Sequence, residues 1–222
     1  MARMSRAAVA EELAERELLP PRSVADGTHR RLLEVALLTF SERGFHGVSV
    51  RELADAAGIR PSSMYAHLAS KEALLMELIS MGHEEHRDRL RRAFASEPND
   101  ITQRMRALVR AHVRLHAEFP LLGRVANREM HALNPARRER VMKIRQEAQD
   151  LLQRTVEEGA AAGVFSVPDP FLAIAVIGGS GIRVAEWWDL GLGYTVEQVE
   201  ETYADFAIRL LTAGPTPDSP DS

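Results

Sequence analysis

Apolar side chains recur every three or four residues along most of this chain, and no stretch alternates apolar with polar residues as a half-buried strand does. Ala, Leu, Glu and Arg, which favour helices, dominate the composition. Proline, glycine and capping patterns divide the chain into about nine helical segments, without an internal repeat. The sequence therefore predicts an all-α fold.

The two ends of the chain differ from the middle. Residues 1–27 predict a flexible, polar N-terminal extension, in which any short helix over 9–19 is stopped by Pro20 and Pro21. Residues 214–222 are rich in Pro, Ser and Asp and predict a disordered tail. The folded domains are expected between these ends.

Composition and missing motifs exclude several classes of protein. Cysteine is absent, which excludes disulfides, cysteine-zinc sites and a cysteine nucleophile. The N-terminus lacks the apolar core of a secretory signal, and the most apolar run, residues 171–182, is shorter than the roughly 20 residues that cross a bilayer. We expect a soluble, cytoplasmic protein with no membrane partner. Phosphate-loop, nucleophile-elbow and HExxH patterns are missing, so no catalysis is expected and a helical enzyme is the alternative class.

A three-helix unit is predicted near the N-terminus. A first helix over 29–43 has Thr28 as its N-cap, and the capping box at residues 49–52 starts a short second helix that Gly58 ends. Pro61 suits the first turn of a third helix. Two short helices joined through a glycine are typical of a helix-turn-helix, although an ordinary helical hairpin has the same spacing.

The third helix of this unit would carry the DNA-reading side chains. Met64 and Leu68 can pack inward, which leaves four small or polar residues outside: Ser62, Ser63, Ala66 and His67. Such side chains allow the backbone to approach DNA closely. The chain's net charge is -4, and residues 28–75 hold six Lys/Arg against five Asp/Glu, a net of +1. Spacing and charge alone leave the DNA-binding unit and the ordinary hairpin both open.

The stretch LLEVALLTFSERGFHGVSVRELADAAGIRPSSMYAHLASKEALLMEL, residues 32–78, resembles the N-terminal domain of TetR-family regulators. The shared features are the FSERGF turn, the SVRELADAAG helix, the YAHL end of the reading helix and the SKEAL start of the next helix. The resemblance implies a helix-turn-helix DNA-binding domain over residues 28–75 that binds double-stranded operator DNA.

The resemblance also implies roles for individual residues. Ser49 would hold a phosphate at a helix N-terminus, Lys71 would pair with another, and Arg51 and Arg60 would reach the DNA backbone. The full set of implied DNA-binding residues is Ser49, Arg51, Arg60, Pro61, Ser62, Ser63, Tyr65, His67 and Lys71. Two positions depart from the family pattern, because Arg60 replaces a small N-cap and Ala66 replaces an aromatic residue, so the base preference is undetermined.

The resemblance further implies that residues 76–213 form a helical ligand-binding and dimerisation domain. An apolar stripe on the last helix supports this, and so does the apolar helix with Gly178–Gly181 inside it. Each glycine there destabilises the helix by roughly 1 kcal/mol relative to alanine, and a close approach of another helix would compensate for this cost. The predicted homodimer interface consists of Ala175, Gly179, Val199, Tyr203, Phe206 and Leu210. The alternative is that the two helices form only the core of a monomer.

Three later stretches, HAEFPLLGRVANREMHAL, RRERVMKIRQEAQ and AVIGGSGIRVAEWW, resemble TetR regulators that answer to acyl-CoA thioesters of lipid or sterol breakdown. This implies a repressor released by such a ligand. Arg183 and Trp187, one turn apart, would then offer a phosphate contact and a stacking surface, with His116 and Met130 as further ligand-binding residues. The alternatives are an Arg183–Glu186 pair on the helix face and a different hydrophobic or aromatic ligand.

Two histidine pairs have helical spacing, His112 with His116 and His83 with His86. Either pair supplies only two ligands, whereas zinc takes three or four from the protein. We therefore predict neither a metal nor a cofactor, and a metal-binding protein is an alternative.

Overall fold

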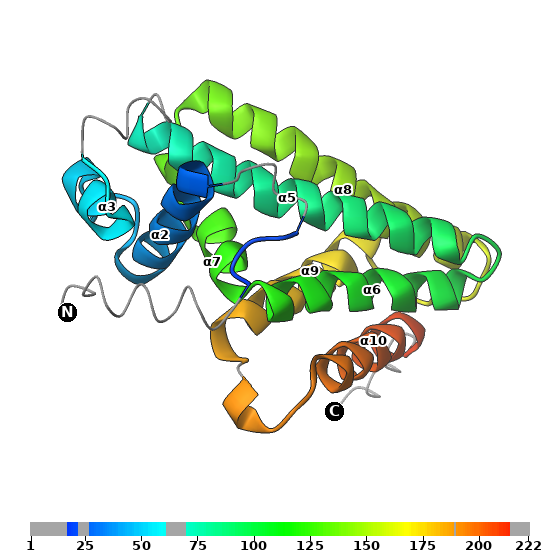
Figure 1. Cartoon of the computed structure of the whole chain (residues 1–222). Helices are drawn as coiled ribbons and strands as arrows, with labels where there is room; N and C mark the ends of the chain where they lie inside the picture. The colour runs from blue at the N-terminus through cyan, green and yellow to red at the C-terminus, as the bar shows by residue number, and fades with distance from the viewer. Residues whose placement is uncertain (1–16, 22–26, 61–69, 189, 214–222) are drawn as a thin grey trace, which may run out of the picture. The chain divides into compact units, whose positions relative to one another are not determined.

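The computed structural model describes residues 17–21, 27–60, 70–188 and 190–213, and within them the prediction of an all-α fold is confirmed (Figure 1). Its helices are α2 (Gly27–Arg43), α3 (Val50–Ala57), α5 (Lys71–Ser96), α6 (Ile101–Glu118), α7 (Pro120–Arg128), η1 (Glu129–Ala132), α8 (Pro135–Ala161), α9 (Pro170–Trp187), η2 (Leu190–Leu192) and α10 (Val196–Thr212). The third helix of the predicted helix-turn-helix lies outside the described residues.

Local capping explains most helix boundaries. Ser49 and Glu52 form the predicted capping box of α3, and Gly58 ends this helix with φ 76°, a conformation that glycine adopts without strain. Thr195 opens α10 through a second capping box. The prediction for Thr28 is wrong, because α2 already begins at Gly27 and Thr28 lies inside it.

The chain divides into two compact units. The first comprises residues 1–85 and 119–143, and the second residues 86–118 and 144–222, so α5 and α8 each contribute to both. This division differs from the expected domain boundary after residue 75.

Packing within the first unit explains why it extends past that boundary. Helix α7 packs against α2, and a Cβ built on Gly82 of α5 would lie 3.0 Å from the Cβ of Ala126 in α7. The first unit's core contains Leu32, Leu33, Leu37 and Phe40 of α2, Leu53 of α3, and Leu74, Leu75 and Leu78 of α5. Leu18, Leu19 and Pro20 are also buried, so this part of the expected flexible extension is packed rather than free in solvent.

In the second unit, α6 contacts both α9 and α10. Its core includes Leu108 and Val113 of α6, Ile177 and Val184 of α9, and Ala204 and Leu211 of α10. Among the described helices, none is long and apolar enough to cross a membrane.

Candidate functional site

Helix α3, the first helix of the predicted helix-turn-helix, has a tightly bonded N-terminus. The Ser49 N–H donates to Oε2 of Glu52 at 2.8 Å, and the Glu52 N–H donates to the Ser49 hydroxyl at 3.2 Å. Arg43 donates to the other carboxylate oxygen at 3.1 Å. These bonds, the Ser49 backbone bond first, lower the pKa of Glu52 to about 2. The carboxylate therefore stays charged and fixes the start of α3.

The arginines expected to reach DNA project from this helix and its end. The Arg51 side chain is 85% exposed and lies 4.0 Å from Asp55, and Arg60 is also exposed. Both arginines are open to solvent, and their contact with DNA stays a prediction. The predicted contacts of Pro61, Ser62, Ser63, Tyr65 and His67 lie outside the described residues.

The resemblance implied that Lys71 pairs with a DNA phosphate, but in the structure its ammonium contacts the protein itself. Its ammonium donates to the carbonyl oxygens of Phe45 and Val48, at 2.7 and 2.6 Å, and lies 4.0 Å from the centroid of the Phe45 ring. Burial lowers the pKa of Lys71, and the nearby Glu52 carboxylate opposes this shift. Two of the three N–H donors are used inside the protein, so a phosphate contact would depend on the third.

The outer faces of α9 and α10 carry much of the predicted dimer interface. Ala175 and Gly179 are exposed on α9, beside Leu172 and Val176. On α10, Phe206 is 59% exposed and Leu210 is also exposed. These residues are available to a second chain.

Val199, by contrast, does not lie on the outer face of α10. Its side chain is only 5% exposed and belongs to the core of the second unit, and Tyr203 is partly buried against that core. The apolar stripe of α10 therefore faces inward at its N-terminal end and outward at its C-terminal end, so Val199 has little surface to offer a second chain.

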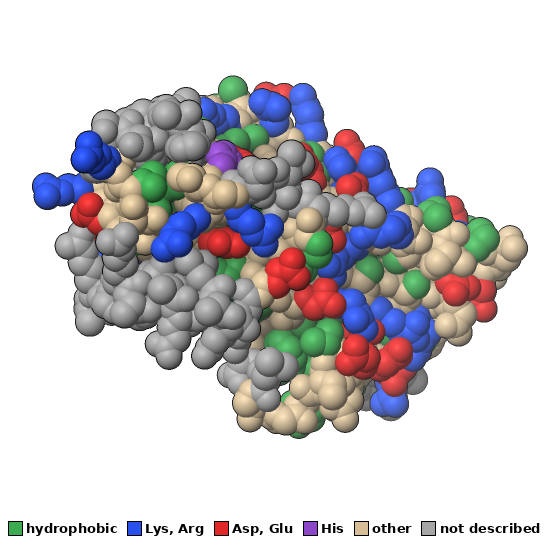
Figure 2. All heavy atoms as spheres, viewed as in Figure 1, with side chains coloured by type: hydrophobic (Ala, Val, Ile, Leu, Met, Phe, Trp, Pro, Cys, Tyr) green, Lys and Arg blue, Asp and Glu red, His purple; other side chains and the backbone are tan. Residues whose placement is uncertain are grey.

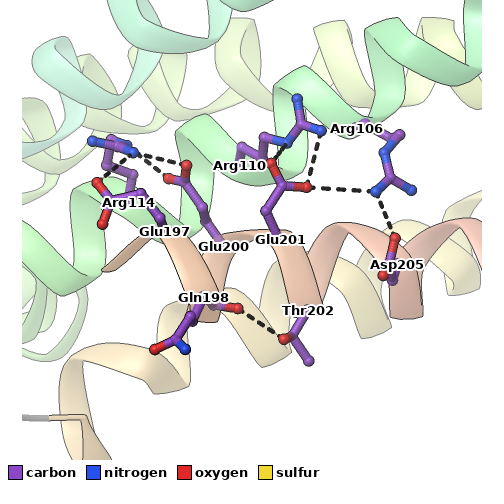
Figure 3. Close-up of polar contacts among 9 residues, drawn as sticks. All are labelled: Arg106, Arg110, Arg114, Glu197, Gln198, Glu200, Glu201, Thr202 and Asp205. Carbon is purple, nitrogen blue, oxygen red and sulfur yellow. Dashed lines mark hydrogen bonds and ion pairs between the residues drawn. The ribbon is translucent and has the colours of Figure 1, made fainter. Parts of the chain in front are cut away.

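A ladder of ion pairs joins α6 to α10. Arg106, Arg110 and Arg114 are spaced four residues apart on α6 and face carboxylates of α10 (Figure 3). Arg114 forms a two-pronged contact with Glu200, Nε to Oε2 at 2.7 Å and Nη2 to Oε1 at 2.8 Å. Figure 2 shows acidic and basic side chains side by side over this part of the surface.

Further contacts complete the ladder. Arg110 lies 2.8 Å from Glu201, and Arg106 contacts Asp205. The bonds to Glu200 raise the pKa of Arg114. The ladder fixes α10, and with it Phe206 and Leu210, on the second unit.

Three buried or half-buried imidazoles meet inside the second unit. Nε2 of His86 lies 2.8 Å from Nδ1 of His112, and Nε2 of His112 lies 3.0 Å from the Gly178 carbonyl oxygen. Because a carbonyl only accepts, His112 carries its proton on Nε2 and accepts at Nδ1 from His86. Nδ1 of His116 lies 2.8 Å from the His112 carbonyl oxygen. In the described part of the chain, no group of three or more metal-ligating side chains is arranged to hold an ion.

The four predicted ligand-binding residues differ in burial and in the unit to which they belong. Arg183 and Trp187 lie on the exposed face of α9, with Trp187 42% exposed, whereas His116 is buried in the second unit. Met130 is buried in the first unit. Arg183 shares its helix face with the predicted interface residues Gly179 and Ala175, four and eight residues away.

Comparison with known families decides the class of protein. The model described as "Tetracyclin repressor-like, C-terminal domain" matches residues 98–211, which is half of the chain, and the model for "Bacterial regulatory proteins, tetR family" matches residues 32–78. The chain belongs to the tetR family.

Individual tetR-family relatives agree with this assignment. The HTH-type transcriptional repressor KstR2 of Rhodococcus jostii is 25% identical over 188 residues, which cover 84% of this chain and 92% of that protein. A solved tetR-family regulatory protein from Rhodococcus RHA1 superposes with a TM-score of 0.78 at 26% identity, covering 85% of this chain and 98% of that one. AibR, solved with isovaleryl coenzyme A and operator DNA, has the same fold, with a TM-score of 0.72 at 21% identity, covering 85% of this chain and all of that one.

Two contacts of this tetR-family chain were not predicted from the sequence. The histidines were paired along single helices, but the hydrogen bond joins His86 of α5 to His112 of α6. Glu129 of η1 accepts a hydrogen bond from the Phe45 N–H at 3.1 Å, across a separation of 84 residues. No local pattern in the sequence indicates either contact.

Proposed function

We propose that the protein is a homodimeric repressor that binds a two-fold operator through its helix-turn-helix and leaves it when an acyl-CoA thioester binds. In this proposal residues 28–75 form the DNA-binding domain and residues 76–213 the ligand-binding and dimerisation domain. It acts in the cytoplasm by binding rather than by catalysis.

One observation carries the DNA-binding half of the proposal. Helix α3 lies in the part of the chain that matches the tetR-family N-terminal model. It has a capped N-terminus, and the side chain of Arg51 on it is 85% exposed to solvent. Phosphate contacts by such arginines supply most of the affinity of a DNA-binding protein, while the following helix reads the bases. Arg60 extends the same surface.

The exposed apolar faces of α9 and α10 favour a second copy as partner. Isolated soluble chains rarely leave large apolar patches uncovered. Gly178 and Gly179 have no described atom outside their helix within 4 Å of where a Cβ would lie. Glycines at such positions weaken a helix without a benefit inside one chain, whereas they allow the helix of a second chain to approach closely. A dimer also presents two reading helices to the two halves of an operator.

The proposed effector class follows from relatives and from α9. KstR2 of Mycobacterium tuberculosis is described as a ketosteroid transcriptional regulator, and AibR was solved with a short acyl-CoA. In this chain, Arg183 and Trp187 offer a cation and an aromatic ring on one exposed helix face. Such a pair suits the phosphates and the base of a coenzyme A moiety.

The DNA-binding half is tested by a salt-dependent gel shift on the promoter region of the protein's own gene. We expect wild-type binding to weaken steeply as salt rises, and Arg51→Ala to bind more weakly with a salt slope smaller by about one unit. Arg209→Ala, which removes an equal charge from the exposed surface of α10, is the control and should bind as wild type. Equal affinities for wild type and Arg51→Ala would remove this residue from the interface.

The effector half is tested by titrating acyl-CoAs of increasing chain length against the preformed DNA complex. Release by thioesters but not by free fatty acids or coenzyme A alone is the expected result. Loss of the Arg183 contact should weaken release roughly 10- to 100-fold in Arg183→Ala. Release only by free acids or aromatic compounds would refute the thioester class, and equal release of both proteins would refute the role of Arg183.

A further inference from the structure

The turn between α2 and α3 is bonded on both sides by charged side chains that belong to neither helix. The Phe45 N–H donates to Oε2 of Glu129 at 3.1 Å, and the Phe45 carbonyl accepts from Lys71 at 2.7 Å. Lys71 also reaches the carbonyl of Val48, directly before the N-cap Ser49. Both backbone polar groups of Phe45 thus have charged partners, which form stronger hydrogen bonds than neutral ones.

The turn is also packed tightly around these bonds. The Phe45 side chain is buried and meets the Phe40 ring edge-on, with ring centroids 5.5 Å apart. Gly44 has φ 71°, and a Cβ at this position would lie 3.4 Å from Oε1 of Glu129. Glu129 therefore lies beside both Gly44 and Phe45.

A second set of contacts completes a closed ring of contacts around the turn, which runs from Phe45 through Lys71, Glu72 and residues 129–137 back to Phe45. Glu72, which follows Lys71, accepts hydrogen bonds from the backbone and side-chain nitrogens of Asn134 at 3.0 and 2.9 Å. It also lies 3.4 Å from Arg137. Residues 129–137 are thereby bonded to the first turn of α5 as well as to the turn before α3.

The position of this segment in the chain gives the ring its importance. Residues 119–143 belong to the first unit, but the stretches before and after them, 86–118 and 144–222, belong to the second. The peptide chain therefore enters the ring from the second unit and returns to it.

We infer that Glu129 is a positioning residue for operator binding, which holds the turn at Phe45 and thereby sets the orientation of α3 and Arg51. It touches no DNA itself and acts through the Phe45 N–H. This inference rests on the proposed function. It adds a regulatory contact outside the helix-turn-helix, at the place where the remainder of the chain is joined to it.

The test uses the full-length dimer and three variants. Glu129→Met keeps the length of the side chain but removes the acceptor, Glu129→Gln keeps an acceptor oxygen without the charge, and Glu84→Ala removes a carboxylate from an exposed position of α5. Removing a negative charge near DNA strengthens binding by itself, so a loss of affinity in Glu129→Met has the opposite sign to the simple charge effect. Operator affinity is measured by anisotropy, with folding checked by urea denaturation.

We expect Glu129→Met to bind the operator about 10-fold more weakly, which corresponds to 1.4 kcal/mol. Glu129→Gln should remain within about threefold of wild type, because its amide oxygen still accepts from Phe45. Glu84→Ala should bind at least as tightly as wild type. Affinity in Glu129→Met equal to that of Glu84→Ala, or in Glu129→Gln as weak as in Glu129→Met, would overturn the inference.

A second measurement needs no DNA. Hydrogen exchange of the Phe45 amide should be slow in wild type and Glu129→Gln and faster in Glu129→Met. Fast exchange in wild type would overturn the positioning contact even if the operator is bound. Failure of the wild-type protein to bind any operator would instead refute the proposed function, while the exchange result would still report on the contact.

Discussion

The imidazole of His112 occupies the space that a side chain at position 181 would need. A Cβ built on Gly181 would lie 2.2 Å from Cδ2 and 2.4 Å from Nε2 of this ring. The glycine therefore allows α6 and α9 to approach until His112 can donate to the Gly178 carbonyl. Of the glycines on α9, Gly181 serves the core of one chain, whereas Gly178 and Gly179 leave open space outside it.

Gly181→Ala should destabilise the second unit. The added methyl group must displace a buried ring, and overpacking of this kind costs typically 1–3 kcal/mol, most of which the roughly 1 kcal/mol that alanine contributes to a helix does not offset. The same substitution in a His112→Ala background is the matched control, because the ring that the methyl group would meet is then absent. Urea denaturation should show a larger loss of stability from Gly181→Ala in wild type than in that background. Equal losses would contradict this account of α9.

The free energy of unfolding should fall as the pH drops below about 6.5. Burial lowers the pKa of His112 from its ordinary 6.5 in the folded protein. Between the lowered and the ordinary pKa, the unfolded chain binds a proton that the folded chain does not, so stability rises with pH across this window and is fully present above it. Denaturation at pH 7.5 to 5.5 should give a shallower pH dependence for His112→Gln than for wild type. Parallel curves would show that another group is responsible.

Arg114→Ala should weaken the attachment of α10. Glu200 is buried, with a side chain 8% exposed, and loses its two-pronged partner. Removing one member of a buried pair destabilises by 3–5 kcal/mol, and because Arg114 is itself 36% exposed we expect a smaller effect of about 2 kcal/mol. Arg114→Ala combined with Glu200→Gln should recover part of this loss. A double variant no more stable than the single one would argue against the pair.

Phe206→Glu should yield monomers that lose operator binding, if the outer face of α10 joins two chains. A charge placed in an apolar interface lacks solvent and a partner. Met142→Glu, at an exposed apolar residue of α8, is the control and should leave the dimer intact. Sedimentation at micromolar concentration separates these outcomes. Wild-type protein that sediments as a monomer would refute the dimer.

The sequence was most informative where structure is determined locally. The capping box at Ser49 and the end of α3 at Gly58 involve residues a few positions apart, and both predictions are confirmed. Val199 was assigned to the wrong surface because periodicity shows that a stripe is apolar but not which partner covers it.

Long-range contacts account for the remaining differences. Lys71 bonds to the turn at Phe45 and Val48, and Glu129 reaches Phe45 from the other side. Such contacts depend on how helices distant in the sequence pack together, which a single sequence does not show. The DNA-contact and interface residues stay predictions for the same reason.

The spacing of the ion-pair ladder limits how α10 can move. Arg106, Arg110 and Arg114 repeat every four residues, and so do Glu197, Glu201 and Asp205. If α10 advanced along α6 by one helical turn, about 5.4 Å, two of the three arginines would again face carboxylates. A displacement of half a turn would leave them facing none. Glu200 stands outside the repeat, and its two-pronged contact with Arg114 favours the register seen here over the one-turn alternative.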